Sequence, residues 1–200
     1  MFINRPFILA SKSKSRKFIL ESNNLNFKQR KPKCDESSHK KRLLRIKKTP
    51  LEISLELSKI KATSISKKIK NKLVVASDTT INFKGELIGK AKNLKQVKKI
   101  IKNFSGKTHI INTSAVAYFN EKLLWKRTEK TTVKIRRLSE LEINDYIKKT
   151  GKTLLETTGC YQIEKNGPTI IEWIKGDYFC VMGFPLFSFL TFLKKIKAEA

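Results

Sequence analysis

The chain has 200 residues, 40% of them hydrophobic, which suits one α/β domain spanning residues 1–200, and no apolar run is long enough to span a membrane. Three cysteines without a CxxC pair and only two histidines argue against a disulfide framework or zinc site and favour a reducing cytoplasm. The net charge of +27 suggests a polyanionic partner, but the lysines are spread along the chain with few interleaved aromatics, so we favour a solvated surface over nucleic-acid binding.

The first elements in chain order alternate apolar runs with basic, polar stretches. Residues 7–10 (FILA) predict a buried strand, and this run is too brief for a signal peptide. A Ser/Lys turn leads into an amphipathic helix of about 14–23, and residues 24–48 predict a mobile, partly extended segment. Thr49-Pro50-Leu51-Glu52 matches a capping box with proline at the first helical position, so we expect a helix from about 50 to 70.

The middle of the chain predicts strands. KLVVAS reads as a central strand that ends near Ser77, so we expect Asp78 at its carboxyl end. Residues 80–88 continue as a hairpin around Lys84-Gly85, and Asn93 caps a helix to about 104. Two long strands are expected to follow, over about 108–119 and 123–136.

The last quarter begins with another helix signal. Ser139-Glu140-Leu141-Glu142 is a second capping box, and it opens a helix that Gly151 ends. We expect three short strands and then a C-terminal helix, over residues 158–164, 169–174, 178–182 and about 186–196.

Groups suited to a triphosphate occur in three segments. Hydrolysis of a triphosphate needs a divalent cation, carboxylates that hold it and orient water, and cations or N–H groups that bind the phosphates. ASKSKSRK lies before a helix N-terminus, where the helix dipole favours phosphate, although a surface turn with capping serines is the alternative. ASDTT places Asp78 after a buried strand, where an ordinary turn residue is the alternative. In ELIGKAKN, Lys90 follows a glycine.

Two further acids could complete a metal site with Asp78. Asp35 and Glu36 carry the carboxylate oxygens that magnesium prefers, and their alternative role is simple solvation within a basic run.

Taken in order, these segments resemble the Maf family of nucleoside triphosphate pyrophosphatases over nearly the whole chain. The family pattern L-A-S-x-S-P-R-R is similar to LASKSKSR, with Lys14 where proline is usual and Ser15 where the first arginine is usual. Further similar segments are Asp35-Glu36, LSKIKA with Lys61, Ser77-Asp78-Thr79, Gly89-Lys90-Ala91, Ser105-Gly106-Lys107-Thr108-His109, LSELEINDY and the block from Gly159 to Leu186.

The resemblance implies a mixed α/β fold like that of inosine triphosphate pyrophosphatases: an elongated sheet flanked by helices, two lobes with a central cleft, and a homodimer. It implies that Asp78 is the general base and, with Glu36, holds Mg²⁺ or Mn²⁺. It further implies a substrate-binding set consisting of Ser11, Ser13, Arg16, Lys61, Lys90 and Glu164.

The block around Glu164 indicates the subgroup. Members that act on dTTP and UTP usually carry K-A-G-x-Y-x-I-Q-G, whereas this chain has TTGCYQIE. Glu164, Glu172 and Gly176 match the 7-methyl-GTP branch, while Lys165 and Trp173 depart from it. We therefore favour a 7-methyl-GTP-like substrate, with dTTP/UTP hydrolysis as one alternative and a catalytically weakened nucleic-acid-binding protein as another.

Overall fold

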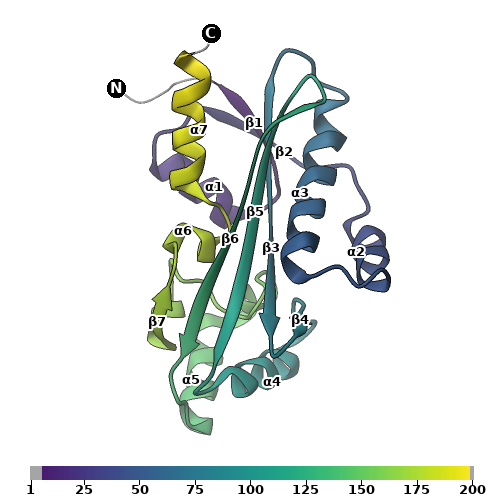
Figure 1. Cartoon of the computed structure of the whole chain (residues 1–200). Coiled ribbons are helices and arrows are strands. Elements are labelled where there is room, and N and C mark those ends of the chain that lie inside the picture. Colours follow the sequence, from purple (N-terminus) through teal and green to yellow (C-terminus); the bar gives the residue numbers. More distant parts are fainter. Residues whose placement is uncertain (1–5, 199–200) are drawn as a thin grey trace.

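A mixed sheet of seven strands runs the length of the molecule in the computed structural model, which describes residues 6–198 (Figure 1). The strands are β1 (Phe7–Ala10), β2 (Phe27–Arg30), β3 (Leu73–Phe83), β4 (Glu86–Ile88), β5 (Thr108–Phe119), β6 (Lys122–Ile135) and β7 (Ile171–Lys175). Their order is β2-β1-β3-β5-β6-β7, and β4 pairs with β3. β1 is parallel to β2 and β3, and the other pairs are antiparallel. The expected elongated mixed sheet is confirmed.

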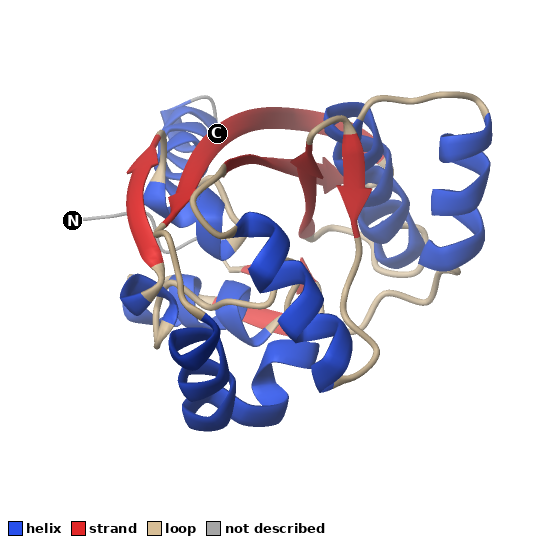
Figure 2. Cartoon of the chain, turned by 90° about the horizontal axis from the view of Figure 1, so that it is seen from below, coloured by secondary structure: helices blue, strands red, loops and turns tan. Residues whose placement is uncertain are grey.

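Helices flank this sheet on both sides (Figures 1 and 2). They are α1 (Lys14–Ser22), α2 (Glu36–Arg45), α3 (Pro50–Ser66), α4 (Leu94–Phe104), α5 (Glu140–Thr150), α6 (Tyr178–Met182) and α7 (Leu186–Ala198), with 3-10 turns η1 (Gly151–Leu155) and η2 (Gly167–Thr169). Among the residues from 6 to 198, no helix combines the length and apolar character that crossing a membrane requires.

The core has two layers because β3 is apolar on both faces. Leu73 and Val75 join the larger cluster, which includes residues of α1, α4, α5 and α7, whereas Val74 and Ala76 join the smaller cluster with α3. Successive strand side chains point to opposite faces, so a near-continuous apolar run is what a central strand covered on both sides requires. β3 is therefore packed between α3 on one face and the larger cluster on the other.

The capping signals correctly predicted where three helices begin. At Thr49 and at Ser139 the hydroxyl accepts the N–H of the glutamate three residues later, and that glutamate in turn accepts the cap N–H. Asn93 accepts the N–H of Gln96 at 2.9 Å and begins α4. These signals are local, so tertiary packing was not needed to find them.

Segment 24–48 differs from the expectation of a mobile, extended stretch, because it contains β2 and α2. β2 is an edge strand with an exposed KQR sequence, so it lacks the alternating pattern that marks a half-buried strand. α2 is almost wholly polar, and its one buried residue, Leu43, packs against Ile53 and Leu57 of α3. Both elements depend on neighbours that local sequence does not reveal.

Two predicted strands and one predicted helix end were also wrong. Residues 178–182 form helix α6 rather than a strand, because Asp177 caps them by accepting the N–H of Phe179 at 2.7 Å. Residues 158–164 form turns with an isolated bridge between Thr158 and Lys90 instead of a strand. The helix from residue 50 ends at Ser66 rather than near 70.

Candidate active site

The turn between β1 and α1 is held by its own serines. Ser11 Oγ accepts the N–H of Ser13 at 3.1 Å, and Ser13 Oγ accepts the N–H of Arg16 at 3.3 Å as the N-cap of α1. Each hydroxyl still has its own hydrogen to donate. The expected position of this turn at a helix N-terminus is confirmed.

Arg16 is a buried cation held by neutral oxygens. Its Nε donates to the Gly183 carbonyl at 2.7 Å, its Nη2 to Thr79 Oγ1 at 3.1 Å, and its Nη1 to Ser11 Oγ at 3.4 Å. Burial lowers the pKa of Arg16, and the nearby carboxylates of Asp78 and Glu36 partly oppose this effect. Among the described residues no carboxylate forms an ion pair with it, so its charge is available to an anion.

Asp78, Lys61 and Glu36 form a charged cluster that joins three elements. Lys61 lies on α3 and is 6% exposed. Its ammonium donates to Asp78 Oδ1 and lies 2.9 Å from Glu36 Oε2 at the start of α2. Asp78 was expected at a strand end, but it lies inside β3, opposite Ser114 of β5. The reason is that β3 continues along β5 after its pairing with β1 ends at Val75.

Asp35 does not join this cluster, contrary to the expected role as a metal ligand. Its Oδ1 accepts the N–H of Ser38 at 3.0 Å, so its carboxylate caps α2 and is exposed. The cap places the next residue, Glu36, beside Lys61.

Lys90 approaches from the loop between β4 and α4, where it forms the bridge with Thr158. Partial burial lowers its pKa, and the nearby charges of Arg16 and Lys61 lower it further. Within residues 6–198 no ion pair with a carboxylate neutralises Lys90. An anion bound between these three cations would relieve their mutual repulsion.

The segment from Thr157 to Glu164 supplies a less charged wall. Glu164 Oε1 accepts the hydroxyl of Ser15 at 2.5 Å, and the Tyr161 hydroxyl lies 2.6 Å from His109 Nε2. His109 is buried and stacks on Phe104 with ring centroids 4.3 Å apart. Burial lowers the pKa of His109 to about 4, so the imidazole is neutral at pH 7. The hydrogen bond between this imidazole and the Tyr161 hydroxyl holds the Tyr161 ring in place.

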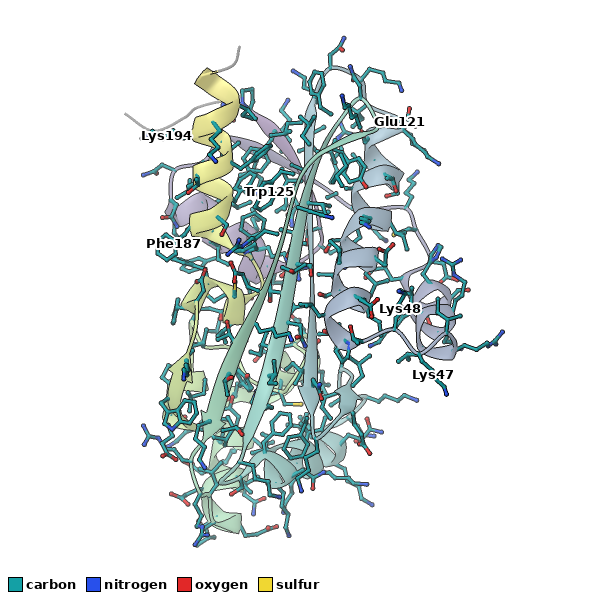
Figure 3. The ribbon with its side chains drawn as sticks, viewed as in Figure 1. Lys47, Lys48, Glu121, Trp125, Phe187 and Lys194 are labelled. Carbon is teal, nitrogen blue, oxygen red and sulfur yellow. The ribbon has the colours of Figure 1, made fainter. Side chains whose placement is uncertain are left out.

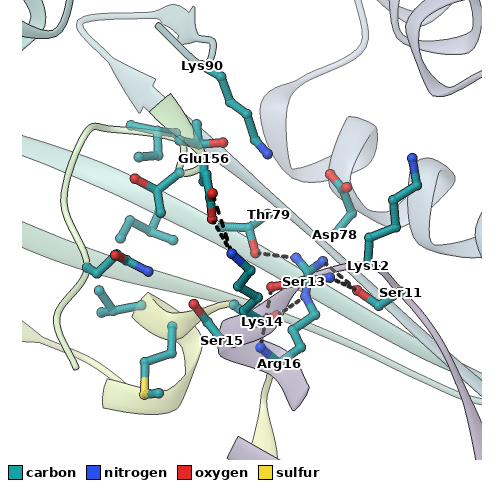
Figure 4. Close-up of a pocket in the computed structure, with 18 of the residues that line it drawn as sticks. Ser11, Lys12, Ser13, Lys14, Ser15, Arg16, Asp78, Thr79, Lys90 and Glu156 are labelled. Atoms are coloured by element: carbon teal, nitrogen blue, oxygen red, sulfur yellow. Dashed lines mark hydrogen bonds and ion pairs between the residues drawn. The ribbon is translucent and has the colours of Figure 1, made fainter. Parts of the chain in front are cut away.

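These groups surround one cavity of about 460 Å³, a size typical of ligand sites (Figure 4). Of the nine candidate site residues, Asp35 does not line it, and the other eight do: Ser11, Ser13, Arg16, Glu36, Lys61, Asp78, Lys90 and Glu164. Within the described chain no group of three or more His, Cys, Asp or Glu side chains could hold a metal ion alone. The cavity therefore joins a cluster of cations and carboxylates to a wall of mixed apolar and polar side chains.

The sequence profile of the family described as Maf-like protein matches residues 6–196, almost the whole chain. The chain belongs to the Maf family. Similar relatives include a nucleoside triphosphate pyrophosphatase of Pelagibacter ubique, 35% identical over 96% of this chain and 99% of the relative. A 7-methyl-GTP pyrophosphatase of Rhizobium meliloti is 28% identical over 96% of each chain. Among solved structures, the Staphylococcus aureus Ham1 protein aligns with a TM-score of 0.46 and 14% identity, covering 96% of this chain and 99% of its own.

Two groups in this Maf site were not predicted. The Gly183 carbonyl accepts hydrogen bonds from both Arg16 Nε and the Ser77 hydroxyl, the latter at 2.8 Å; the sequence placed Gly183 only within the block from Gly159 to Leu186 that resembles the family. A Cβ at Gly183, where φ is +106°, would lie 3.1 Å from Thr79 Oγ1 and 3.3 Å from Arg16 Nη2. The other group is an ion pair between Lys14 and Glu156, 142 residues apart, which no local pattern signals.

Proposed function

We propose that this Maf protein hydrolyses nucleoside triphosphates to the monophosphate and pyrophosphate, as part of nucleotide-pool housecleaning. The observation that carries the proposal is the position of Asp78 beside Lys61 in a cavity that also holds Arg16 and Lys90. A carboxylate close to several cations can accept a proton from water while the cations bind phosphate oxygens.

In the proposed reaction a water molecule attacks the α-phosphorus and transfers a proton to Asp78. The bond from the α-phosphorus to the bridging oxygen breaks, and pyrophosphate leaves with that oxygen and its electrons. Lys90 and Arg16 stabilise the negative charge that builds on the leaving group, while the hydroxyls of Ser11 and Ser13 donate to phosphate oxygens. Lys61 positions the Asp78 carboxylate.

Asp78 and Glu36 fit a divalent cation only as part of its coordination shell. Both carboxylates contact the Lys61 ammonium, and Mg²⁺ commonly takes one or two carboxylates with phosphates and waters as its other ligands. A bound Mg²⁺ or Mn²⁺ would neutralise phosphate charge. The two residues can therefore hold such an ion once a triphosphate completes the ligand set.

Glu164 supports a guanine-type base such as that of 7-methyl-GTP. A carboxylate only accepts hydrogen bonds, and the guanine edge offers two neighbouring N–H donors where thymine and uracil offer one N–H between two carbonyls. Ser15 donates to one oxygen of Glu164, and among the described residues no side chain donates to the other. That second oxygen is the group we assign to the base.

We further propose a homodimer that works in the cytoplasm. Tyr178, Phe179 and Phe187 form an aromatic group: the ring centroid of Phe179 lies 5.8 Å from that of Tyr178 and 5.3 Å from that of Phe187. Phe187 is 63% exposed (Figure 3). Exposed apolar groups of this kind support a protein interface, which light scattering of the purified protein tests. All three cysteines are free, in keeping with a reducing compartment.

Hydrolysis in water labelled with heavy oxygen tests the proposed bond cleavage. Attack at the α-phosphorus puts the label into the nucleoside monophosphate and leaves the pyrophosphate unlabelled. Label in pyrophosphate, or release of orthophosphate, would mean attack at another phosphorus and would overturn this mechanism.

A further inference from the structure

An ion pair at the cavity joins the start of α1 to the segment after η1. Lys14 Nζ lies 3.1 Å from Glu156 Oε2 and 3.4 Å from Oε1, and both residues line the cavity (Figure 4). The two side chains are 83% and 53% exposed, so solvent screens the pair and it contributes little to stability. Stability alone therefore gives no reason for a lysine here.

The position of Lys14 in α1 also opposes a purely structural role. It is the first residue of the helix, directly after the Ser13 cap, and the first turn contains no acidic residue. A cation at this end of a helix is repelled by the positive end of the helix dipole. The same dipole attracts an anion to the site that the Lys14 ammonium can reach.

The neighbouring Ser15 cannot supply charge to that anion. Its hydroxyl is uncharged and donates its hydrogen to Glu164. Arg16 is buried and its guanidinium is fixed by Gly183 and Thr79. Lys12 of the same turn also lines the cavity, but of these two lysines it is Lys14 that an ion pair holds there. Lys14 has three donors on a long, flexible stem, so it can turn from one partner to another.

We propose that Lys14 is a further phosphate-binding residue, and that Glu156 holds its ammonium at the cavity until a triphosphate displaces the carboxylate. The inference rests on the proposed function, because the triphosphate is the anion that Lys14 would meet. A triphosphate carries several negative charges against the one of Glu156, and breaking an exposed ion pair costs little. Glu156 is then a positioning residue that competes with the substrate.

Calorimetry in a metal-free buffer measures how tightly the whole protein binds inorganic triphosphate. It tests the proposal without requiring turnover. Lys14→Met should weaken binding by about five- to tenfold, the scale of one charge-assisted hydrogen bond in a partly solvated site. Lys17→Met is the matched control, since Lys17 pairs with Glu21 at 3.4 Å on the same helix and does not line the cavity. That variant should stay within about twofold of the parent protein.

Glu156→Gln separates competition from simple loss of structure. It should tighten triphosphate binding in the parent protein and have no such effect when Lys14 is already methionine. Equal binding by the Lys14 and Lys17 variants, weaker binding by Glu156→Gln, or no binding by the parent protein would overturn the proposal.

Kinetics distinguish this inference from the proposed function. With a nucleoside triphosphate substrate, Lys14→Met should raise KM and leave kcat unchanged. If the parent protein binds inorganic triphosphate through Lys14 but hydrolyses no nucleotide, the proposed function fails and the binding role of Lys14 stands. If hydrolysis proceeds and Lys14→Met leaves KM unchanged, the inference fails alone.

Discussion

Replacing Asp78 by asparagine removes the proposed general base and leaves almost all of its surroundings in place. Asparagine has the same shape, its Oδ1 can still accept from Lys61, and Lys61 keeps Glu36 at 2.9 Å. Loss of a positioned general base costs about 10²- to 10⁴-fold in kcat. We therefore expect turnover to fall by at least about a hundredfold.

The stability cost of the same change should be small. The ion pair becomes a hydrogen bond from the Lys61 ammonium to a neutral amide oxygen, and Lys61 keeps Glu36 as a charged partner, so the loss is about 1 kcal/mol. For a chain of this size such a loss lowers Tm by about 2–4 °C. Pyrophosphate release and scanning calorimetry on one preparation of Asp78→Asn measure both quantities.

Asp35→Asn is the matched control, because Asp35 caps α2 and does not line the cavity. Asparagine caps helices as well as aspartate does, so turnover and Tm should both stay at the parent values. Parent-like turnover by Asp78→Asn would refute the role assigned to Asp78. A collapse of Tm in that variant would show that Asp78 acts through the fold instead.

Three further predictions concern the cavity walls and the core. Gly183→Ala should raise KM and destabilise the fold, because φ is +106° there and the new Cβ would press on Thr79 and Arg16. Gly85→Ala is the control: φ is +86° but the space is open, so KM should stay unchanged. Steady-state kinetics and urea unfolding measure both variants. Glu164→Gln should lower kcat/KM for 7-methyl-GTP relative to dTTP by about tenfold, and an unchanged ratio would contradict the role of Glu164. The pKa of His109 is lowered from 6.5 to about 4, so as pH falls the unfolded chain takes up the His109 proton before the folded chain does. The stability that the neutral His109 gives the folded state is therefore fully present above pH 6.5 and is lost as pH falls towards 4. The free energy of unfolding should be about 2 kcal/mol lower at pH 5 than at pH 7, and His109→Phe should reduce this difference.

Local signals in the sequence predicted where helices begin better than they predicted how the elements pack together. The capping boxes at Thr49 and Ser139 specify helix starts through groups three residues apart. The edge strand β2 and the polar helix α2 carry no such periodic signal and exist because of their neighbours. The apolar run of α6 could be strand or helix by composition, and a single cap at Asp177 marks it as helix.

The candidate site was predicted as a set of residues, and its geometry was not. The order of motifs along the chain pointed to Asp78, Lys61 and Lys90, and the fold brings them to one cavity. Lys14 and Glu156 were missed as a pair because a contact across 142 residues leaves no local pattern. Their meeting depends on where α1 and the segment after η1 pack against the sheet.

A pyrophosphate-release screen tests whether this Maf protein cleaves nucleoside triphosphates. It compares 7-methyl-GTP with the standard ribo- and deoxyribonucleoside triphosphates, with magnesium and with manganese. We expect equal amounts of monophosphate and pyrophosphate, with 7-methyl-GTP hydrolysed faster than dTTP or UTP. Absence of pyrophosphate from every triphosphate with either metal would contradict this expectation.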